Sequence, residues 1–179
     1  MVDIPTPTSW NEASWKVLRW MASTEDEMKH LGDTDDRLIQ LRHLQLNMAV
    51  YIKNMLKFGG SEAGISLLVG EAVKAGCVAI GHDIDTEESF DYGAMHGVLC
   101  RKQHDYGHEN INLFGVVGVC VRLCDKIARL MNLYENDIHP DNESVDDTWT
   151  DIVGYSVIAK MLEWDWFKLE LEENFNEPF

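Results

Sequence analysis

The sequence predicts an all-α protein, organised as a single-domain bundle of six helices. Apolar residues recur every three or four positions along most of the chain, which is the period of an amphipathic helix. No segment alternates regularly between apolar and polar residues, so we expect no half-buried strand. The 179 residues are enough for one domain with a sizeable core, and no repeat or domain boundary interrupts them.

The first two predicted helices are defined by signals at their ends. Ser9 and Glu12 have the spacing of a capping box, which predicts a short helix over about residues 10–22. A longer helix is expected over about residues 34–57, because its apolar residues follow the helical period. Gly59 lies just beyond that segment, at a position where glycine commonly ends a helix.

A third helix is expected over about residues 61–80, although three glycines interrupt it. These glycines lie six residues apart: Gly64, Gly70 and Gly76. Each costs about 1 kcal/mol relative to alanine in a helix, so either close packing of a neighbour compensates for them or the helix is broken. Residues 81–87 are predicted to form a loop, and a fourth helix should follow over about residues 88–103.

The last two predicted helices lie on either side of a polar loop. The fifth should cover about residues 113–134, and the loop at residues 136–142 contains Pro140 and several turn-forming residues. Ser144 is a good N-cap, so the sixth helix should begin after it and reach about residue 164. The tail mixes aromatic and acidic residues, which is compatible with a last docked helix or with a partner-binding segment.

The charge of the chain limits the classes of ligand that it can bind. There are 31 acidic and 15 basic residues, and the formal net charge is −16. Non-specific binding to nucleic acid requires a basic surface, so we expect no direct nucleic-acid binding. Anionic small molecules would also be repelled unless local lysines and arginines, or a divalent cation, offset the field.

The four cysteines and the N-terminal sequence indicate a cytoplasmic protein. No two cysteines form a CxxC pair, so we interpret all four as small buried residues, which fits a reducing compartment. The first residues lack the basic start and apolar run of a signal peptide. No stretch of about 18 apolar residues is evident, so no membrane span is expected.

The fifth predicted helix carries four charged residues on one face: Arg122, Asp125, Lys126 and Arg129. Steps of three and four residues place them together. One interpretation is an exposed stripe with an ion pair between Asp125 and Arg129. The other is a charged face turned toward a cleft, where Asp125 binds a metal and the cationic side chains bind phosphate.

The sixth predicted helix stacks three carboxylates at intervals of four residues: Glu143, Asp147 and Asp151. Acidic residues in a first turn complement the helix dipole, which explains Asp147 without a ligand. Asp151 lies beyond that turn, and carboxylates on the same face repel one another. A cation between Asp147 and Asp151 would remove this repulsion, and oxygen ligands suit Mg²⁺ or Mn²⁺.

A polar turn between the fourth and fifth predicted helices adds further candidates. Lys102, Asp105, Tyr106 and Asn110 lie close together in the sequence, around Gly107, which permits a positive φ or a close backbone approach. Asp-Tyr-Gly is also an ordinary way for a helix to end. This turn therefore indicates a functional site only in combination with the two charged helices.

Together the three segments form an ordered set: K-x-x-D-Y-G-x-x-N from Lys102, R-L-x-D-K-x-A-R-L from Arg122, and E-S-V-x-D-T-x-x-D-I-x-G-Y from Glu143. This set resembles the nucleotide modification associated domain 1 family, over about residues 88–165. That family is found largely in bacteriophages and is similar to the MazG-like and dimeric dUTPase-like all-α NTP pyrophosphatases. Residues 1–87 would then be N-terminal helices packed on this core, and residues 166–179 a tail.

The resemblance implies a helical, often oligomeric nucleotide-binding protein of phage nucleotide metabolism, and we expect a homodimer. A Mg²⁺-dependent (d)NTP pyrophosphatase is the enzymatic form of this hypothesis, with Mg²⁺ or Mn²⁺ held by Asp125, Asp147 and Asp151 and with Glu143 as the general base or a further ligand. Phosphate would be bound by the cationic group of Lys102, Arg122, Lys126 and Arg129. The base or sugar would lie against Asp105, Tyr106 and Asn110.

Three alternatives stay open. The chain lacks the ExxE motif that MazG-like enzymes carry on their first acidic helix, which favours a non-catalytic protein that sequesters a nucleotide or signal molecule. The net charge of −16 is also compatible with an acidic protein that binds and inhibits a host protein. Finally, the pairs His82-Asp83 and His104-Asp105, with His43 as a first ligand, permit an HD phosphohydrolase.

Overall fold

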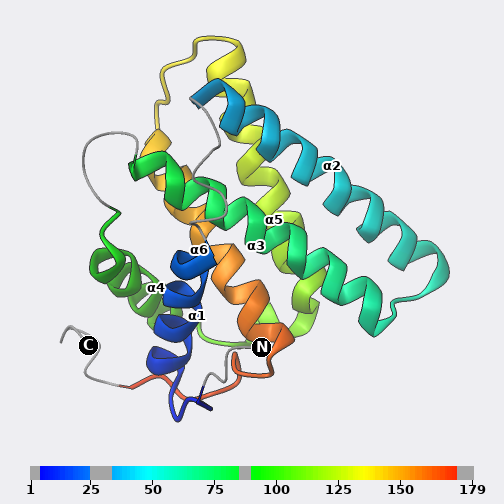
Figure 1. The fold of residues 1–179 in the computed structure, drawn as a ribbon, viewed down its shortest axis with the longest axis vertical. Coiled ribbons are helices and arrows are strands. Elements are labelled where there is room, and N and C mark those ends of the chain that lie inside the picture. Colours follow the sequence, from blue (N-terminus) through cyan, green and yellow to red (C-terminus); the bar gives the residue numbers. More distant parts are fainter. Residues whose placement is uncertain (1–4, 25–33, 85–89, 173–179) are drawn as a thin grey trace.

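The computed structural model describes residues 5–24, 34–84 and 90–172, and these residues form six α-helices and no strand (Figure 1). The helices are α1 (Trp10–Thr24), α2 (Thr34–Phe58), α3 (Glu62–Ile84), α4 (Tyr92–Tyr106), α5 (Glu109–Glu135) and α6 (Val145–Glu163). The prediction of an all-α fold is confirmed. A MazG-like arrangement of its core stays a prediction.

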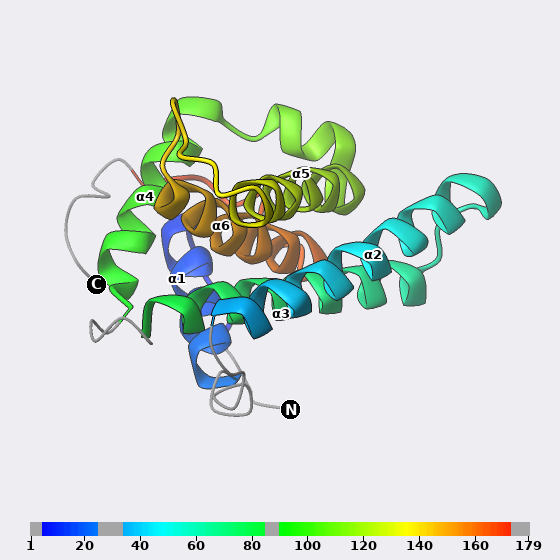
Figure 2. The same ribbon diagram turned by 90° about the horizontal axis from the view of Figure 1, so that it is seen from above.

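Helix α6 is the centre of the bundle. It packs against α3 on one side and α5 on another, and it also contacts α1 and α4. Helices α2 and α3 pack against each other, and Figure 2 shows that the end joining them projects from the rest of the bundle. Because α6 has neighbours on several sides, it buries residues almost all around its circumference, from Trp149 to Met161.

Helix α3 is intact, and one of its glycines shows why. A Cβ atom added to Gly76 would lie 2.5 Å from the Cβ atom of Ser156 in α6 and would also clash with Met21. Ser156 Oγ donates a hydrogen bond of 2.6 Å to the Ala72 carbonyl across the same contact. The glycine therefore permits the close approach of α3 and α6, and the alternative of a broken helix is wrong.

The end of α3 departs from the sequence-based prediction. Residues 81–84 were expected to begin a loop, but they continue the helix, and residues 85–89 lie outside the described part of the chain. Gly81 lies in this added turn, where an added Cβ would be 2.6 Å from Arg37 Nη1. Tertiary packing against α2 therefore extends α3 beyond the point where local sequence predicts its end.

Helix α5 begins earlier than expected and contains a break. It starts at Glu109 instead of about residue 113, directly after α4 ends at Gly107 with φ of 63°. Gly115 has φ of 55° and ψ of −151°, so the first turn of α5 is set at an angle to the rest. Only glycine adopts this conformation without strain. The break directs Asn110 and Ile111 toward the same cavity as the later part of α5.

Side-chain caps begin α1 and α6 where the sequence predicts them. Ser9 Oγ accepts a hydrogen bond of 3.2 Å from the Glu12 amide, and Ser144 forms a complete capping box with Asp147. The Glu12 carboxylate accepts from Thr8 instead of Ser9. A hydrogen bond from Lys16, together with those from Thr8, lowers the pKa of Glu12 to about 2.

The described part of the tail is an irregular strap across the ends of α1, not a further helix. Phe167 is fully buried against the Trp10 ring, with ring centroids 6.3 Å apart. The Trp10 amide donates to the Glu170 carbonyl at 2.9 Å, and the Glu172 amide donates to Asn11 Oδ1 at 2.9 Å. The last-helix hypothesis is therefore wrong for residues 164–172, and residues 173–179 lie outside the described part.

Two surface properties bear on partners. Helix α3 is long and apolar enough to cross a membrane by length and composition alone, but 61% of that segment is buried inside the fold. On α2, the exposed side chains of Ile39, Leu46 and Val50 lie seven and four residues apart, on one face. The expected homodimer stays a prediction.

All four cysteines are free thiols, as predicted, and three of them are buried, whereas Cys124, also expected to be buried, is half-buried. Burial raises the pKa of Cys120 to about 12 and those of Cys100 and Cys124 to about 11. These thiols are therefore protonated at neutral pH and poor nucleophiles.

Candidate ligand-binding cavity

A cavity of about 440 Å³ lies among α1, α4, α5 and α6. Seven of the residues that the sequence singles out line it: Lys102, Tyr106, Asn110, Arg122, Lys126, Glu143 and Asp151. They come from segments that are distant in the sequence and that only the fold brings together. The cavity volume lies within the range of small-molecule sites, which is roughly 300–1,000 Å³.

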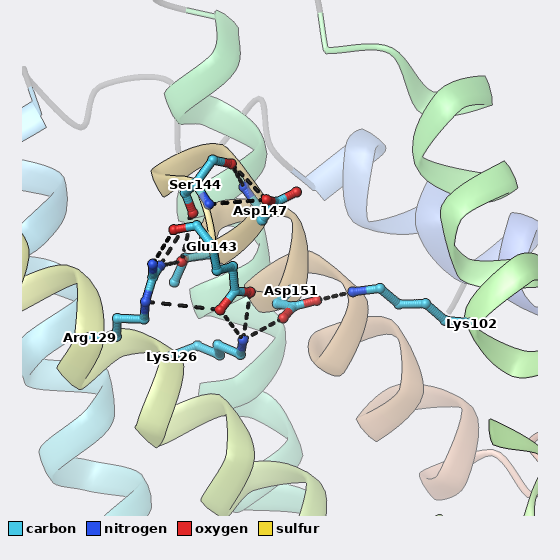
Figure 3. A network of polar contacts seen from close by, with 8 residues as sticks. Lys102, Lys126, Arg129, Glu143, Ser144, Asp147 and Asp151 are labelled. Atoms are coloured by element: carbon cyan, nitrogen blue, oxygen red, sulfur yellow. Dashed lines mark hydrogen bonds and ion pairs between the residues drawn. The ribbon is translucent and has the colours of Figure 1, made fainter. Parts of the chain in front are cut away.

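Asp151 lines this cavity and is the centre of a network of ion pairs (Figure 3). Its side chain is only 11% exposed, and it receives the Lys126 ammonium on Oδ2 at 2.7 Å. Lys102, from α4, binds the other carboxylate oxygen. Burial alone would raise the pKa of Asp151, but the hydrogen bonds from both lysines outweigh burial and hold this pKa below its usual value.

Lys126 also binds Glu143, which precedes α6. The Lys126 ammonium is 2.8 Å and 3.1 Å from the two carboxylate oxygens of Glu143. Burial would lower the pKa of Lys126, but its bonds to Asp151 and Glu143 raise this pKa above its ordinary value. Lys126 is therefore a fixed positive charge between two carboxylates.

Arg129 organises the turn that leads into α6. It donates to the carbonyl oxygens of Glu143 and Ser144 and to the Thr148 hydroxyl. Its Nε lies 3.9 Å from a carboxylate oxygen of Glu143. Arg129 does not line the cavity itself, so its direct contribution is to position Glu143.

Three predicted site residues have other surroundings. Asp147 is the reciprocal member of the capping box, and its Oδ2 accepts from the Ser144 amide at 3.1 Å and the Ser144 hydroxyl at 2.8 Å (Figure 3). Asp125 is exposed and has no hydrogen bond or ion pair with the described residues. Asp105 is 72% exposed and contacts His104. None of the three lines the cavity, and their proposed roles as metal or base ligands stay predictions.

The cavity carries more positive than negative side chains. Lys102, Arg122 and Lys126 face two carboxylates, Glu143 and Asp151. Arg122 has no hydrogen bond or ion pair with the described residues, so its guanidinium keeps its donors for a ligand. In a chain whose net charge is −16, this local excess favours anions at this place over the rest of the surface.

The cavity becomes apolar along α6. Asp151 and Ile158 both line it and lie seven residues apart, which corresponds to about 10 Å of helix. Trp10, Leu99, Ile111 and Tyr155 complete the apolar wall. A ligand that fills the cavity should therefore combine an anionic group with a largely apolar, flat group.

The cavity residues that the sequence-based predictions missed include two with buried nitrogen donors, Trp10 and Gln103. Gln103 is 6% exposed and Trp10 is fully buried, and the donors Gln103 Nε2 and Trp10 Nε1 have no hydrogen-bond partner among the described residues. Gln103 follows the buried Met95 and Leu99 at intervals of four residues on α4. A polar residue in that apolar stripe is the signal that could have identified it.

A divalent cation would have to displace Lys126 from this arrangement. Glu143 and Asp151 converge on the Lys126 ammonium, and the described residues hold no group of three or more histidine, cysteine, aspartate or glutamate side chains arranged to bind a metal. An ammonium and Mg²⁺ cannot share one position between two carboxylates. The Mg²⁺ or Mn²⁺ site expected from the sequence stays a prediction.

The histidine–aspartate pairs of the HD hypothesis lie apart from the cavity lining. His82 lies in the last turn of α3 instead of a loop, and its ring stacks on Trp149 with centroids 4.2 Å apart. His104 Nδ1 is 3.2 Å from Asp105 Oδ1 on the exposed side of α4. The metal site that this hypothesis requires stays a prediction.

No protein family, curated protein or solved structure matches this chain in the comparisons made. The resemblance to the nucleotide modification associated domain 1 family therefore rests on the ordered motifs alone.

Proposed function

We propose that the protein binds a nucleotide in the cavity among α1, α4, α5 and α6. The observation that carries this proposal is the composition of the cavity wall, in which the cationic side chains of Lys102, Arg122 and Lys126 occur together with apolar side chains. Arginine and lysine are the usual partners of phosphate oxygens. The apolar part of the wall matches the flat face of a base.

Each cationic side chain has a distinct part in this proposal. Arg122 offers an unpaired guanidinium, which can bind a phosphate through two parallel hydrogen bonds. Lys102 has a side chain that is 48% exposed and a single carboxylate partner, so it can turn toward a phosphate. Lys126 is held by two carboxylates and contributes mainly its charge.

A protein of this kind would sequester its nucleotide if it lacks turnover. Metal-dependent release of pyrophosphate is the second candidate, and the convergence of Glu143 and Asp151 on one point favours it. Mg²⁺ often binds through one or two carboxylates together with substrate phosphates. Hydrolysis therefore requires that an incoming nucleotide and metal move Lys126 out of its present position.

The test is calorimetric titration of the purified protein with tripolyphosphate and with the common nucleoside triphosphates, with and without Mg²⁺. We expect binding without metal, and we expect Arg122→Gln to weaken it about ten-fold or more, since a charge-assisted bond is worth roughly 1.5–3 kcal/mol. The exposed Arg101, outside the cavity, provides the matched control Arg101→Gln, which should bind as the wild type does.

Chromatography of the same samples separates the two candidates. An unchanged nucleotide supports sequestration, whereas a monophosphate and pyrophosphate that appear only with Mg²⁺ support the pyrophosphatase. Absence of binding to every phosphate compound would refute the proposal. The acidic-interaction hypothesis would then be the one to pursue, by salt-sensitive capture of a basic host protein.

A further inference from the structure

The residues that line the cavity carry only a small excess of positive charge. Lys102, Arg122 and Lys126 contribute three positive charges, and Glu143 and Asp151 contribute two negative ones, which leaves an excess of one positive charge. The contacts of Lys126 raise the pKa of its ammonium, and those of Asp151 lower the pKa of its carboxyl, so both groups are charged at neutral pH. The chain as a whole is acidic, with a net charge of −16, and does not add to the attraction for an anion. The charge balance of the cavity wall therefore limits how much anionic charge a ligand can bring there.

Much of this positive charge is already paired inside the protein. The Lys126 ammonium lies 2.8 Å from a carboxylate oxygen of Glu143 and 2.7 Å from Asp151 Oδ2. Lys102 binds the other carboxylate oxygen of Asp151. Arg122 differs from the two lysines, because it has no hydrogen bond or ion pair with the described residues. One guanidinium binds one phosphate group through two parallel hydrogen bonds, so the described part of the cavity wall offers one uncommitted cation for one phosphate.

Resting on the nucleotide-binding function proposed above, we propose that Glu143 and Asp151 restrict the cavity to nucleotides with a single phosphate group. A phosphate monoester carries about 1.5 to 2 negative charges at neutral pH, which the free guanidinium and the small positive excess can largely balance. Each further phosphoryl group adds negative charge that has no uncommitted cation in the described wall and that the two carboxylates repel. The preferred ligand is therefore a nucleoside monophosphate, and the two carboxylates determine this specificity.

A series of phosphate lengths tests this restriction on the wild-type protein. Calorimetric titration compares the nucleoside, the monophosphate, the diphosphate and the triphosphate of each common base, in the presence of a chelator that removes divalent cations. For the base that binds best, we expect the monophosphate to bind more tightly than the nucleoside and about ten-fold more tightly than the triphosphate. A triphosphate that binds as tightly as the monophosphate, or more tightly, would overturn the inference.

A variant assigns the restriction to a carboxylate. Glu143→Gln removes one negative charge and keeps an oxygen that can accept from Lys126, so it should reduce the preference for the monophosphate over the triphosphate to about two-fold or less. Asp125→Asn is the matched control, because Asp125 is exposed, does not line the cavity and changes the net charge of the chain by the same amount. The control should keep the full preference. A full preference in Glu143→Gln as well would contradict the inference.

A second variant keeps the inference testable if Glu143→Gln does not fold. Arg122→Gln leaves both carboxylates in place, and it should weaken the monophosphate about ten-fold while leaving the affinity for the nucleoside unchanged. Wild-type affinity of Arg122→Gln for the monophosphate would overturn the inference. If the wild-type protein binds neither tripolyphosphate nor any nucleotide, the proposed function fails together with the inference. If nucleotides bind but the monophosphate and the triphosphate bind equally, only the inference fails.

Discussion

Asp151 ties three helices together, since it lies on α6 and binds Lys126 of α5 and Lys102 of α4. Its position also explains why the predicted pair of Asp147 and Asp151 does not form a unit. Asp147 turns back to Ser144 at the start of its own helix, while Asp151, one turn later, faces the cavity. The same residue types at helical spacing therefore serve two separate purposes.

Asp151→Asn removes the charge that both lysines bind, and we expect a loss of about 2 kcal/mol in the free energy of unfolding, measured in urea. Because the pKa of Asp151 is lowered in the folded protein, its contribution is complete above the unfolded pKa of 3.8 and falls as pH drops below it. Asp125→Asn, an exposed and unpaired control, should change stability by less than about 0.5 kcal/mol.

His96 provides a second prediction at this scale. Its Nε2 lies 2.9 Å from the Asn11 carbonyl, and burial lowers its pKa although this hydrogen bond acts in the opposite direction. The unfolded chain therefore binds a proton more readily, so stability should be full above the unfolded pKa of 6.5 and decline as pH falls below it.

This decline can be measured by urea unfolding of the wild type and of His96→Gln between pH 7.5 and pH 5. This range includes the ordinary histidine pKa of about 6.5. Comparison of the two proteins isolates the contribution of His96. The difference in stability between the two proteins should shrink toward acid pH. A constant difference would mean that His96 does not change its protonation on unfolding.

At the scale of the element, α3 offers a test within one helix. Gly76 packs against Ser156 and Met21, whereas an added Cβ at Gly70 would meet nothing within 4 Å. Gly70→Ala should therefore raise the free energy of unfolding by up to about 1 kcal/mol through helix propensity. Gly76→Ala should lower it by about 1–3 kcal/mol through overpacking, as thermal and urea unfolding would show. Changes of the same sign would contradict the packing described here.

Local signals predicted the elements where a side chain or glycine marks a boundary. Ser9, Ser144 and Gly59 lie where helices begin or end in the structure. The predicted helix boundaries are wrong where contacts with residues distant in the sequence determine the backbone conformation. Gly81 continues α3 because the helix packs on Arg37, and Gly115 breaks α5 inside a segment that is apolar on both sides. The sequence around Gly81 does not show that α3 continues there, and the sequence around Gly115 does not show that α5 breaks there.

The sequence predicted many of the residues of the candidate site, but it did not predict which of them contact one another. Helical spacing correctly placed Lys126 and Arg129 on one face, and that face meets the start of α6. Their partners depend on how α5 and α6 pack. Arg129 binds Glu143 and its neighbours, so the ion pair between Asp125 and Arg129, which was one of the two interpretations, does not form. Trp10 was missed because its role depends on α1 lying across the bundle from the charged helices.

At the scale of the whole molecule, the strap at residues 164–172 closes the bundle over α1. Phe167→Ala should lower the free energy of unfolding by about 3–5 kcal/mol, because its ring is fully buried beside Trp10. Phe58, which is 74% exposed at the end of α2, is the matched control, and Phe58→Ala should cost less than about 0.5 kcal/mol. Equal effects in chemical denaturation would show that the strap does not support the fold.

The strap also sets an order of events during synthesis. Asn11 and Glu172 are hydrogen-bonded although they are 161 residues apart, so α1 leaves the ribosome long before the segment that covers it. Trp10, at the start of α1, packs against Phe167 of that segment and must wait for it or be shielded by a chaperone. Since Trp10 forms part of the cavity wall, a nascent chain completes this wall last, after its secondary structure is already in place.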